Sequence, residues 1–215
     1  MIRWNGMDVL ETLDELVDPR HTMLVMWDFA DTIVGNCFNA KSLVQSSARL
    51  LEAARKHGVA IAFSRQNNMH LVGDTGAPTV RMRMHRQGRP VAEIMKVKEP
   101  VGPSPVPRLV PEVTPRDGEI MFEKFCPNAF LGTCFEWWLK QRKIKTIILT
   151  GVNVATGISG TAREAINLGY YAVVARDCVG TGSKEDYDIA VASIERLFDV
   201  VDADDIIAVW NKTHR

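Results

Sequence analysis

The sequence has no excess of charge of either sign, because 26 Lys and Arg residues balance 26 Asp and Glu residues. This balance does not predict a basic surface for nucleic acid or for an acidic membrane. Long hydrophobic runs are also absent, and none approaches the length of a transmembrane helix. Charged residues interrupt residues 1–19, which is unlike a signal peptide. We therefore expect a cytoplasmic protein that binds neither nucleic acid nor a membrane.

Cysteine is scarce, and the spacing of the cysteines and histidines points to no metal site. The five histidines show no His-x-x-x-His or similar spacing of metal ligands. Gly180–Gly182 is not followed by the Gly-Lys-Ser/Thr of a nucleotide phosphate loop. These absences predict reduced thiols, no metal and no cofactor. No Cys-x-x-Cys pair occurs among the four cysteines, which are Cys37, Cys126, Cys134 and Cys178.

Apolar runs of strand length alternate with helical patterns along the chain. Their apolarity is continuous, which indicates strands that are buried on both faces of a parallel sheet. The alternation with helices predicts an α/β fold with a doubly wound, mostly parallel six-stranded sheet. The expected strands are Met23–Trp27, Val59–Phe63, Ile120–Phe122, Thr146–Leu149, Tyr171–Val174 and Phe198–Val201.

Several of the intervening helices have recognisable ends. A helical pattern covers residues 41–57 and closes on Gly58. Thr133–Glu136 and Ser183–Asp186 each fit a capping box, in which a hydroxyl and an acid three residues later satisfy free backbone N–H groups. Another helix follows Gly151 and ends at Gly169, a residue type that is favoured just after a helix.

One segment, residues 65–117, breaks this alternation. It has no strong strand pattern, and seven of the ten prolines lie between Pro90 and Pro115. So long an insertion is seldom structureless inside a compact domain. We expect a single domain over residues 1–215, in which residues 65–117 form a lid or an oligomer contact. Its arginines form either a solvated face or a contact for an anionic substrate; they are Arg81, Arg83, Arg86 and Arg89.

Polar residues follow the expected strands at the place where ligands bind in such sheets, beyond the carboxyl ends. Asp28 follows the first strand, Gln66 the second, Lys124 the third and Gly151 the fourth. An acid and a lysine that face one crevice can fix each other's charge and act as a proton-transfer pair. The alternative for the same two residues is a partly buried structural salt bridge.

Three motifs of the chain resemble those of the isochorismatase-like hydrolase family. Asp28 closes the first strand as the acid of that family does, and Glu123–Phe130 is similar to its lysine motif. Gly151–Ala165, followed by Gly169-Tyr170, resembles the strand–helix block that carries a nucleophilic cysteine in most members. The resemblance covers the chain from Met23 to about Val209. It implies a three-layer α/β/α sandwich that forms homodimers or homotetramers.

Gly157 stands where most members of this family have the cysteine. The resemblance implies that Asp28 and Lys124 are catalytic, but a glycine has no side chain with which to attack. Isochorismatases also have glycine here, and in them the aspartate protonates a vinyl ether and water captures the cation. The resemblance thus implies acid–base hydrolysis of a small carboxylated metabolite. Asp28 is expected to be the proton donor or base, with Lys124 stabilising developing negative charge.

The resemblance also implies a set of substrate-binding residues around this pair. Gln66 falls where isochorismatases carry a substrate-binding glutamine, and Asn153 stands where they have a tyrosine. Gly157 and the start of its helix would leave room for the substrate or bind an oxyanion. The expected set is Gln66, Asn153, Gly157, Phe29 and Phe125.

Two other hypotheses stay open at this point. A non-catalytic, small-molecule-binding relative would keep the fold without turnover, although Asp28 and Lys124 are both present. An amidase or ureide hydrolase of the same family would need a displaced nucleophile, and Cys126 lies two residues from Lys124. No metal is expected in either case, because Arg65–Asn68 lacks the Asp and His ligands of the nicotinamidase branch.

Overall fold

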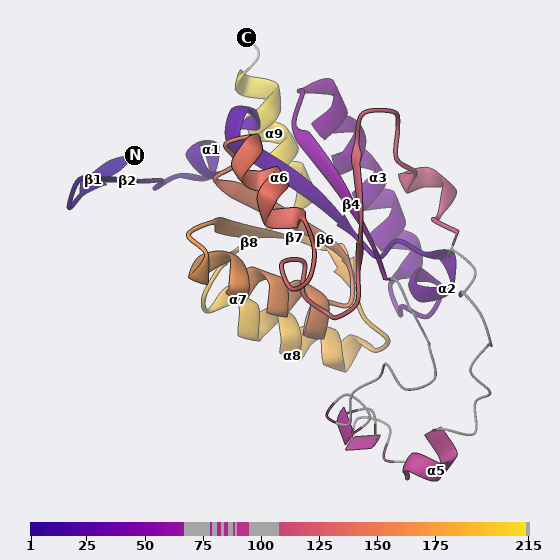
Figure 1. The fold of residues 1–215 in the computed structure, drawn as a ribbon. Helices are drawn as coiled ribbons and strands as arrows, with labels where there is room; N and C mark the ends of the chain where they lie inside the picture. Colours follow the sequence, from indigo (N-terminus) through magenta and orange to yellow (C-terminus); the bar gives the residue numbers. More distant parts are fainter. Residues whose placement is uncertain are drawn as a thin grey trace. The chain divides into compact units, whose positions relative to one another are not determined.

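A six-stranded parallel sheet forms the centre of the fold (Figure 1). The computed structural model describes residues 1–66, 78, 81–82, 84–85, 88, 90–94 and 108–213. The strands are β3 (Thr22–Trp27), β4 (Ala60–Gln66), β5 (Ile120–Lys124), β6 (Thr146–Val152), β7 (Tyr171–Gly180) and β8 (Asp199–Val201). Their order is β5-β4-β3-β6-β7-β8, and every neighbouring pair is parallel. The six strands expected from the apolar runs and the parallel sheet are confirmed.

The sheet is doubly wound about β3. From β3 the chain moves outward through β4 to β5 and then returns to β6 on the other side of β3. The direction of winding therefore reverses between β3 and β6, and ligands bind at such a switch point in open parallel sheets. Asp28 directly follows β3, and Gly151 lies near the carboxyl end of β6.

Helices connect most of the strands, as the alternating pattern predicts. The longer ones are α3 (Ala40–Lys56), α6 (Phe135–Gln141), α7 (Ser159–Asn167), α8 (Lys184–Glu195) and α9 (Ala203–Thr213). The shorter ones are α1 (Leu13–Leu16), α2 (Asp31–Val34) and α5 (Val91–Ile94), with 3-10 turns η1 (Pro19–His21) and η2 (Pro111–Val113). A π-helical turn, η3 (Val154–Ile158), leads directly into α7. No described helix is long and apolar enough to cross a lipid bilayer.

Of the two expected capping boxes, the one at Ser183 has the expected side-chain cap, and the one at Thr133 is wrong. The Ser183 hydroxyl accepts a hydrogen bond from the Asp186 N–H at 3.1 Å and caps α8. Cys134, rather than Thr133, is the N-terminal cap residue of α6, and its side chain makes no capping bond. The Thr133 hydroxyl donates to the Ala129 carbonyl in the preceding loop and accepts a hydrogen bond from the Phe135 N–H at 3.1 Å, rather than from the Glu136 N–H of a capping box.

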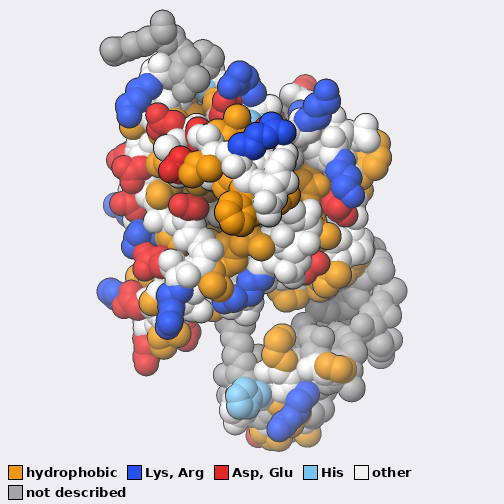
Figure 2. All heavy atoms as spheres, turned by 90° about the vertical axis from the view of Figure 1, so that its left-hand side faces the viewer, with side chains coloured by type: hydrophobic (Ala, Val, Ile, Leu, Met, Phe, Trp, Pro, Cys, Tyr) orange, Lys and Arg blue, Asp and Glu red, His pale blue; other side chains and the backbone are white. Residues whose placement is uncertain are grey.

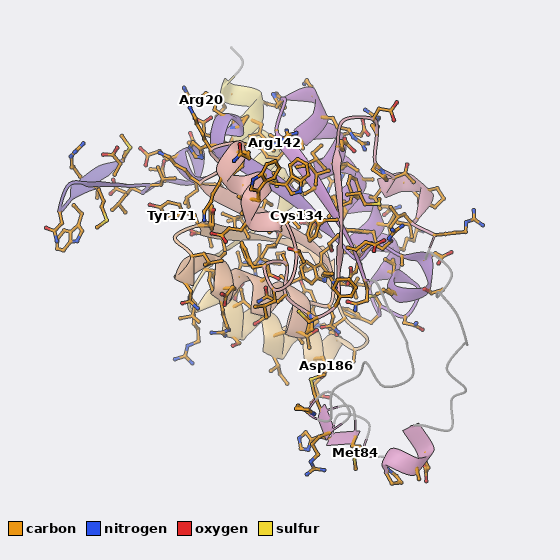
Figure 3. The ribbon with its side chains drawn as sticks, in the orientation of Figure 1. Arg20, Met84, Cys134, Arg142, Tyr171 and Asp186 are labelled. Atoms are coloured by element: carbon orange, nitrogen blue, oxygen red, sulfur yellow. The ribbon has the colours of Figure 1, made fainter. Side chains whose placement is uncertain are left out.

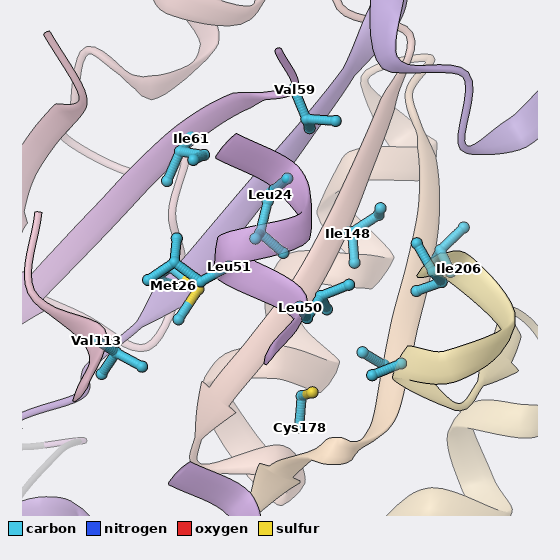
Figure 4. Packing of buried hydrophobic residues seen from close by; sticks show 14 of the residues in the cluster. Leu24, Met26, Leu50, Leu51, Val59, Ile61, Val113, Ile148, Cys178 and Ile206 are labelled. Atoms are coloured by element: carbon cyan, nitrogen blue, oxygen red, sulfur yellow. The ribbon is translucent and has the colours of Figure 1, made fainter. Parts of the chain in front are cut away.

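The sheet lies between two helical layers. On one face, α3 and α9 pack against the sheet in a core cluster that contains Leu24 and Met26 (Figure 4). On the other face, α6, α7 and α8 pack in a cluster that contains Met23, Val25 and Trp27. Alternate residues of β3 thus enter opposite cores, because successive strand side chains point to opposite faces. The three-layer α/β/α sandwich is confirmed.

An antiparallel hairpin precedes the sandwich and was not predicted. Its strands, β1 (Ile2–Trp4) and β2 (Met7–Val9), are joined by Asn5 and Gly6, which have φ angles of 46° and 81°. Asn-Gly with two positive φ angles is the preferred two-residue hairpin turn. After the hairpin, the Leu10 N–H donates to the hydroxyl of Tyr171 at 3.1 Å, which fixes the chain to the start of β7. Tyr171 is labelled in Figure 3.

The chain forms two compact units, Met1–Gln66 with Pro107–Arg215, and Asn67–Val106. Most of the insertion at residues 65–117 lies outside the described residues, including Arg83, Arg86 and Arg89. Its C-terminal part belongs to the larger unit, since Val113 is fully buried there and the Val110 N–H donates to the Phe29 carbonyl at 3.0 Å.

Candidate active site

Three neighbouring strands bring their polar residues together at their carboxyl ends. Asp28 follows β3, and Gln66 and Lys124 are the last residues of β4 and β5. Gln66 and Lys124 are direct partners in the β4–β5 register. Because parallel strands end at the same edge of a sheet, residues far apart in sequence meet here.

Asp28 and Lys124 form a buried ion pair. The Lys124 Nζ donates to Asp28 Oδ2 at 2.6 Å and to Gln66 Oε1 at 2.7 Å. Lys124 is 1% exposed and Asp28 is 7% exposed. The structure therefore brings together three of the expected site residues: Asp28, Lys124 and Gln66.

Ser64 belongs to the same cluster and was not among the expected site residues. Its buried hydroxyl donates to Asp28 Oδ1 at 3.3 Å, and its carbonyl accepts the Asp28 N–H at 3.3 Å. A hydroxyl that directly follows the apolar run Val59–Phe63, near the carboxyl end of a buried strand, was the available signal. Ser64 and Lys124 thus bind the two carboxylate oxygens of Asp28 separately.

The backbone also fixes Asp28. Its φ angle is 50°, in the left-handed region that few residues other than glycine, asparagine and aspartate adopt readily. Such a conformation costs about 1–3 kcal/mol and persists where the surroundings over-determine it. Here both the backbone N–H and the carboxylate are bound by the neighbouring strands, so the carboxyl group has one defined position.

Burial shifts both members of the pair towards their neutral forms. Loss of water raises the pKa of Asp28, although the charge of Lys124 and the hydrogen bonds to the carboxylate act in the opposite direction. Loss of water likewise lowers the pKa of Lys124, against the attraction of Asp28. The pKa values of Asp28 and Lys124 therefore lie closer together than those of free Asp and Lys. This similarity suits proton transfer.

The Trp27 ring lies against both Lys124 and Gly157. The Nζ of Lys124 lies 4.3 Å from the centroid of the Trp27 ring. Gly157 is buried in the π-helical turn η3, before α7. A Cβ atom built on Gly157 would lie 2.6 Å from Nε1 and 2.7 Å from Cε2 and Cζ2 of Trp27. The edge of the indole thus lies directly against Gly157.

The remaining expected residues are placed differently from this cluster. The Asn153 side chain accepts a hydrogen bond from the Ala155 N–H at 2.8 Å and donates one to the Thr181 hydroxyl at 2.8 Å, so it caps η3. Phe29 is fully buried in the core cluster on the side of α3 and α9. Phe125 is 51% exposed after β5.

The thiols differ strongly in their surroundings. Burial raises the pKa of Cys37 to about 11 and raises that of Cys178 well above its ordinary value. Cys126 is partly buried, and Cys134 is exposed at the start of α6 (Figure 3). Within the described part of the chain, no group of three His, Cys, Asp or Glu side chains is placed to hold a metal ion.

Comparison with known proteins identifies related chains. The model of the isochorismatase domain matches residues 22–205. The isochorismatase family protein YwoC of Bacillus subtilis is 28% identical over 178 residues, which cover 83% of this chain and 87% of YwoC. N-carbamoylsarcosine amidase of Arthrobacter is 26% identical over 67% of this chain and 52% of the amidase, so only about half of that enzyme is matched.

The solved structures agree on the fold. An isochorismatase-like hydrolase from Alkaliphilus metalliredigens superimposes with a TM-score of 0.72 at 18% sequence identity, over 88% of this chain and 99% of that one. At this level of identity the likeness concerns the fold.

Proposed function

The chain belongs to the isochorismatase family of hydrolases, and from this premise we propose that it hydrolyses a small carboxylated metabolite without a cysteine nucleophile. In this proposal Asp28 and Lys124 perform acid–base catalysis, and water is the nucleophile. The observation that carries it is the buried ion pair, 2.6 Å long, whose lysine lies against the same Trp27 ring as Gly157.

The proposed steps follow from the state of this pair. Burial raises the pKa of Asp28, which favours the protonated form that a general acid needs. With a vinyl ether such as that of isochorismate, Asp28 donates its proton to the terminal vinyl carbon and a cation stabilised by the ether oxygen forms. Lys124 stabilises the carboxylate that remains. Water adds to the cation and returns a proton to Asp28, and the resulting hemiketal separates into pyruvate and an alcohol.

The position of Gln66 supports a role in binding. Its Oε1 accepts a hydrogen bond from Lys124, while its side-chain NH₂ group provides two donors. In the proposal these donors bind a carboxylate or hydroxyl oxygen of the substrate and orient it towards Asp28. The expectation that Gly157 leaves room for the substrate does not fit, because the Trp27 ring occupies the space that a side chain there would fill. In the proposal the backbone N–H groups at the start of its helical segment bind an oxyanion instead.

The first experiment is a coupled assay of pyruvate release from isochorismate. The wild type is compared with Asp28→Asn and Lys124→Met, and both substitutions are expected to abolish release. Lys184 and Asp188 provide matched controls, since they form an ion pair of the same 2.6 Å length on the surface of α8. Asp188→Asn and Lys184→Met are expected to retain full turnover. Release that survives Asp28→Asn would contradict the proposal.

Amide hydrolysis is a second candidate, because a relative named N-carbamoylsarcosine amidase matches 67% of this chain. Ammonia release from a panel of carbamoyl and amide substrates would support it. Ligand binding without turnover of either substrate type would instead support the non-catalytic relative.

We also propose that the chain assembles as a homodimer or homotetramer. Figure 2 shows hydrophobic side chains gathered near the centre of the face that it presents. Large exposed side chains such as Trp137 and Leu131 are each more than half exposed, and burying such side chains favours association. Light scattering coupled to size-exclusion chromatography gives the mass of the assembly, and a monomeric mass at micromolar concentration would contradict this proposal.

A further inference from the structure

The position of Trp27 is fixed by both neighbouring strands. Its partners in the sheet are Ser64 on β4 and Gly151 on β6. Gly151 lies so close that a Cβ atom there would be 1.9 Å from the Trp27 carbonyl oxygen. The backbone of Trp27 therefore cannot shift without breaking the centre of the sheet, and its side chain can move only by changing rotamer.

The indole of Trp27 fills a volume that a side chain at position 157 would need. Three ring atoms lie 2.6–2.7 Å from the position of a Cβ on Gly157, whereas ordinary carbon contacts begin near 3.4 Å. The ring is 1% exposed and is packed in the core cluster beneath α6 and α7. A residue larger than glycine at position 157 would thus force Trp27 out of its rotamer and into a dense core, where volume changes are poorly tolerated.

The same ring is the apolar wall against which the Lys124 ammonium group rests. Its Nζ, 4.3 Å from the ring centroid, is within the range of a cation–π interaction. The other partners of Nζ are Asp28 Oδ2 and Gln66 Oε1. A rotation of the indole would remove this wall and leave Lys124 held by those oxygens alone.

We propose that Trp27 is a positioning residue of the active site, whose indole both requires glycine at position 157 and holds the Lys124 ammonium group against Asp28. Because this role assumes that Asp28 and Lys124 are the reacting pair, it rests on the proposed function. It also adds a constraint: introducing a thiol at position 157 requires a second substitution at Trp27. Trp27 contributes packing and electrostatics and exchanges no proton with the substrate.

The steric part is tested by thermal unfolding of four proteins: wild type, Gly157→Ala, Trp27→Leu and the Trp27→Leu/Gly157→Ala double variant. Gly157→Ala is expected to melt several degrees lower than the wild type or to fail to fold. The double variant is expected to fold and to melt no lower than Trp27→Leu alone, because alanine is preferred to glycine in a helical segment. Gly182→Ala is the control, since its Cβ has only an ordinary contact at 3.9 Å. A Gly157→Ala protein as stable as the wild type, or additive effects in the double variant, would overturn the steric part.

The electrostatic part is tested by NMR titration of the Lys124 ammonium group in the wild type, Trp27→Phe and Trp27→Leu. Trp27→Phe keeps an aromatic face and is expected to retain the pKa of Lys124 within experimental error. Trp27→Leu is expected to lower it by roughly half to one pH unit, the equivalent of a cation–π interaction. Equal pKa values in the three proteins would overturn the positioning role. Neither test uses a substrate, so a wrong proposed function and a wrong role for Trp27 give different results.

Discussion

The ammonium nitrogen of Lys124 and the Oδ2 atom of Asp28 are 2.6 Å apart, in a place where both side chains are buried. Burial raises the pKa of Asp28 and lowers that of Lys124. An isolated charge would be costly here, so each group depends on the other for its protonation state.

This dependence predicts how turnover varies with pH. The acid form of Asp28 is the proton donor, so turnover is expected to fall as pH rises through the raised pKa of Asp28. Lys124→Met removes the positive charge that lowers this pKa, and the pKa is expected to rise further. NMR titration of the Asp28 carboxyl carbon measures both values, with Lys184→Met as the exposed control. An Asp28 that titrates near pH 3.9, the usual value for aspartate, would contradict the prediction.

The same pair predicts a coupled effect on stability. Removing one partner of a buried ion pair costs about 3–5 kcal/mol, and we expect Lys124→Met to lower the free energy of unfolding by that amount at pH 7. The loss should shrink in acid, because the pKa of Asp28 rises further without Lys124, so the variant regains more stability than the wild type as pH falls through that raised pKa. The Asp28→Asn/Lys124→Met double variant is expected to be more stable than the sum of its single effects. Strict additivity in urea unfolding would show that the two residues are independent.

Gly151 is expected to be irreplaceable. Its φ angle is 103°, and a Cβ atom would meet the Trp27 carbonyl oxygen at 1.9 Å. Gly151→Ala should therefore cost at least about 3 kcal/mol or prevent folding. Gly182→Ala should stay within about 1 kcal/mol of the wild type. Circular dichroism melting curves compare the two, and equal midpoints would refute the prediction.

A second ion pair, far from the site, supports the fold. The Arg55 guanidinium donates to Glu119 at 2.7 Å and 2.9 Å, and both side chains are only slightly exposed. Burial acts to raise the pKa of Glu119, but the bonds from Arg55 and from the Arg116 N–H outweigh it and lower the pKa below its ordinary value. The Glu119 carboxylate therefore contributes stability above pH of about 4.3, the usual pKa of glutamate. This contribution is lost as pH falls through the lowered pKa of the folded state.

Glu119→Gln is accordingly expected to destabilise the protein by about 1–2 kcal/mol at pH 7 and by less in acid. Glu52→Gln, at a more exposed partner of the same arginine, is the matched control and should have a smaller effect. Unfolding by urea at pH 7 and pH 3.5 measures both. A loss that is the same at the two pH values would contradict the role of the Glu119 charge.

The thiols are expected to react in an order set by burial. Cys134 should be alkylated by iodoacetamide in the native protein, whereas Cys37 and Cys178 should be protected, since burial raises their pKa. Peptide mass spectrometry identifies the modified residues. Cys126→Ala is expected to change turnover by less than about twofold, while a hundredfold loss would support an amidase with a displaced nucleophile.

The six strands of the sheet could be predicted because each is buried on both faces and reads as a continuous apolar run. The pairing of Asp28 with Lys124 followed from the ends of these strands, since parallel strands place their carboxyl ends together. The N-terminal hairpin was missed although Asn5-Gly6 carries its signal, because strands of three residues show no recognisable period. The expected capping box at Thr133 was wrong, because Cys134 is the N-cap residue of α6 and the Thr133 hydroxyl bonds to the Phe135 N–H and to the preceding loop.

Other parts of the site depend on side-chain direction, which the sequence does not display. Phe29 directly follows Asp28, yet it is buried in the core on the side of α3. The side chain of Trp27 enters the opposite core and reaches Gly157, more than a hundred residues later in the chain. Spacing along the sequence gives no sign of such a contact, because it depends on one rotamer and on the packing of two segments.

The central position of β3 in the sheet also affects how the chain folds during synthesis on the ribosome. β3 pairs with β4 early in translation, but its other neighbour, β6, begins at Thr146. Until that segment emerges, one edge of a strand that is fully buried in the folded protein stays open to other chains. Premature termination before this point therefore gives an aggregation-prone product, and the last segments of the sheet have to be synthesised before the nascent chain can bury its core.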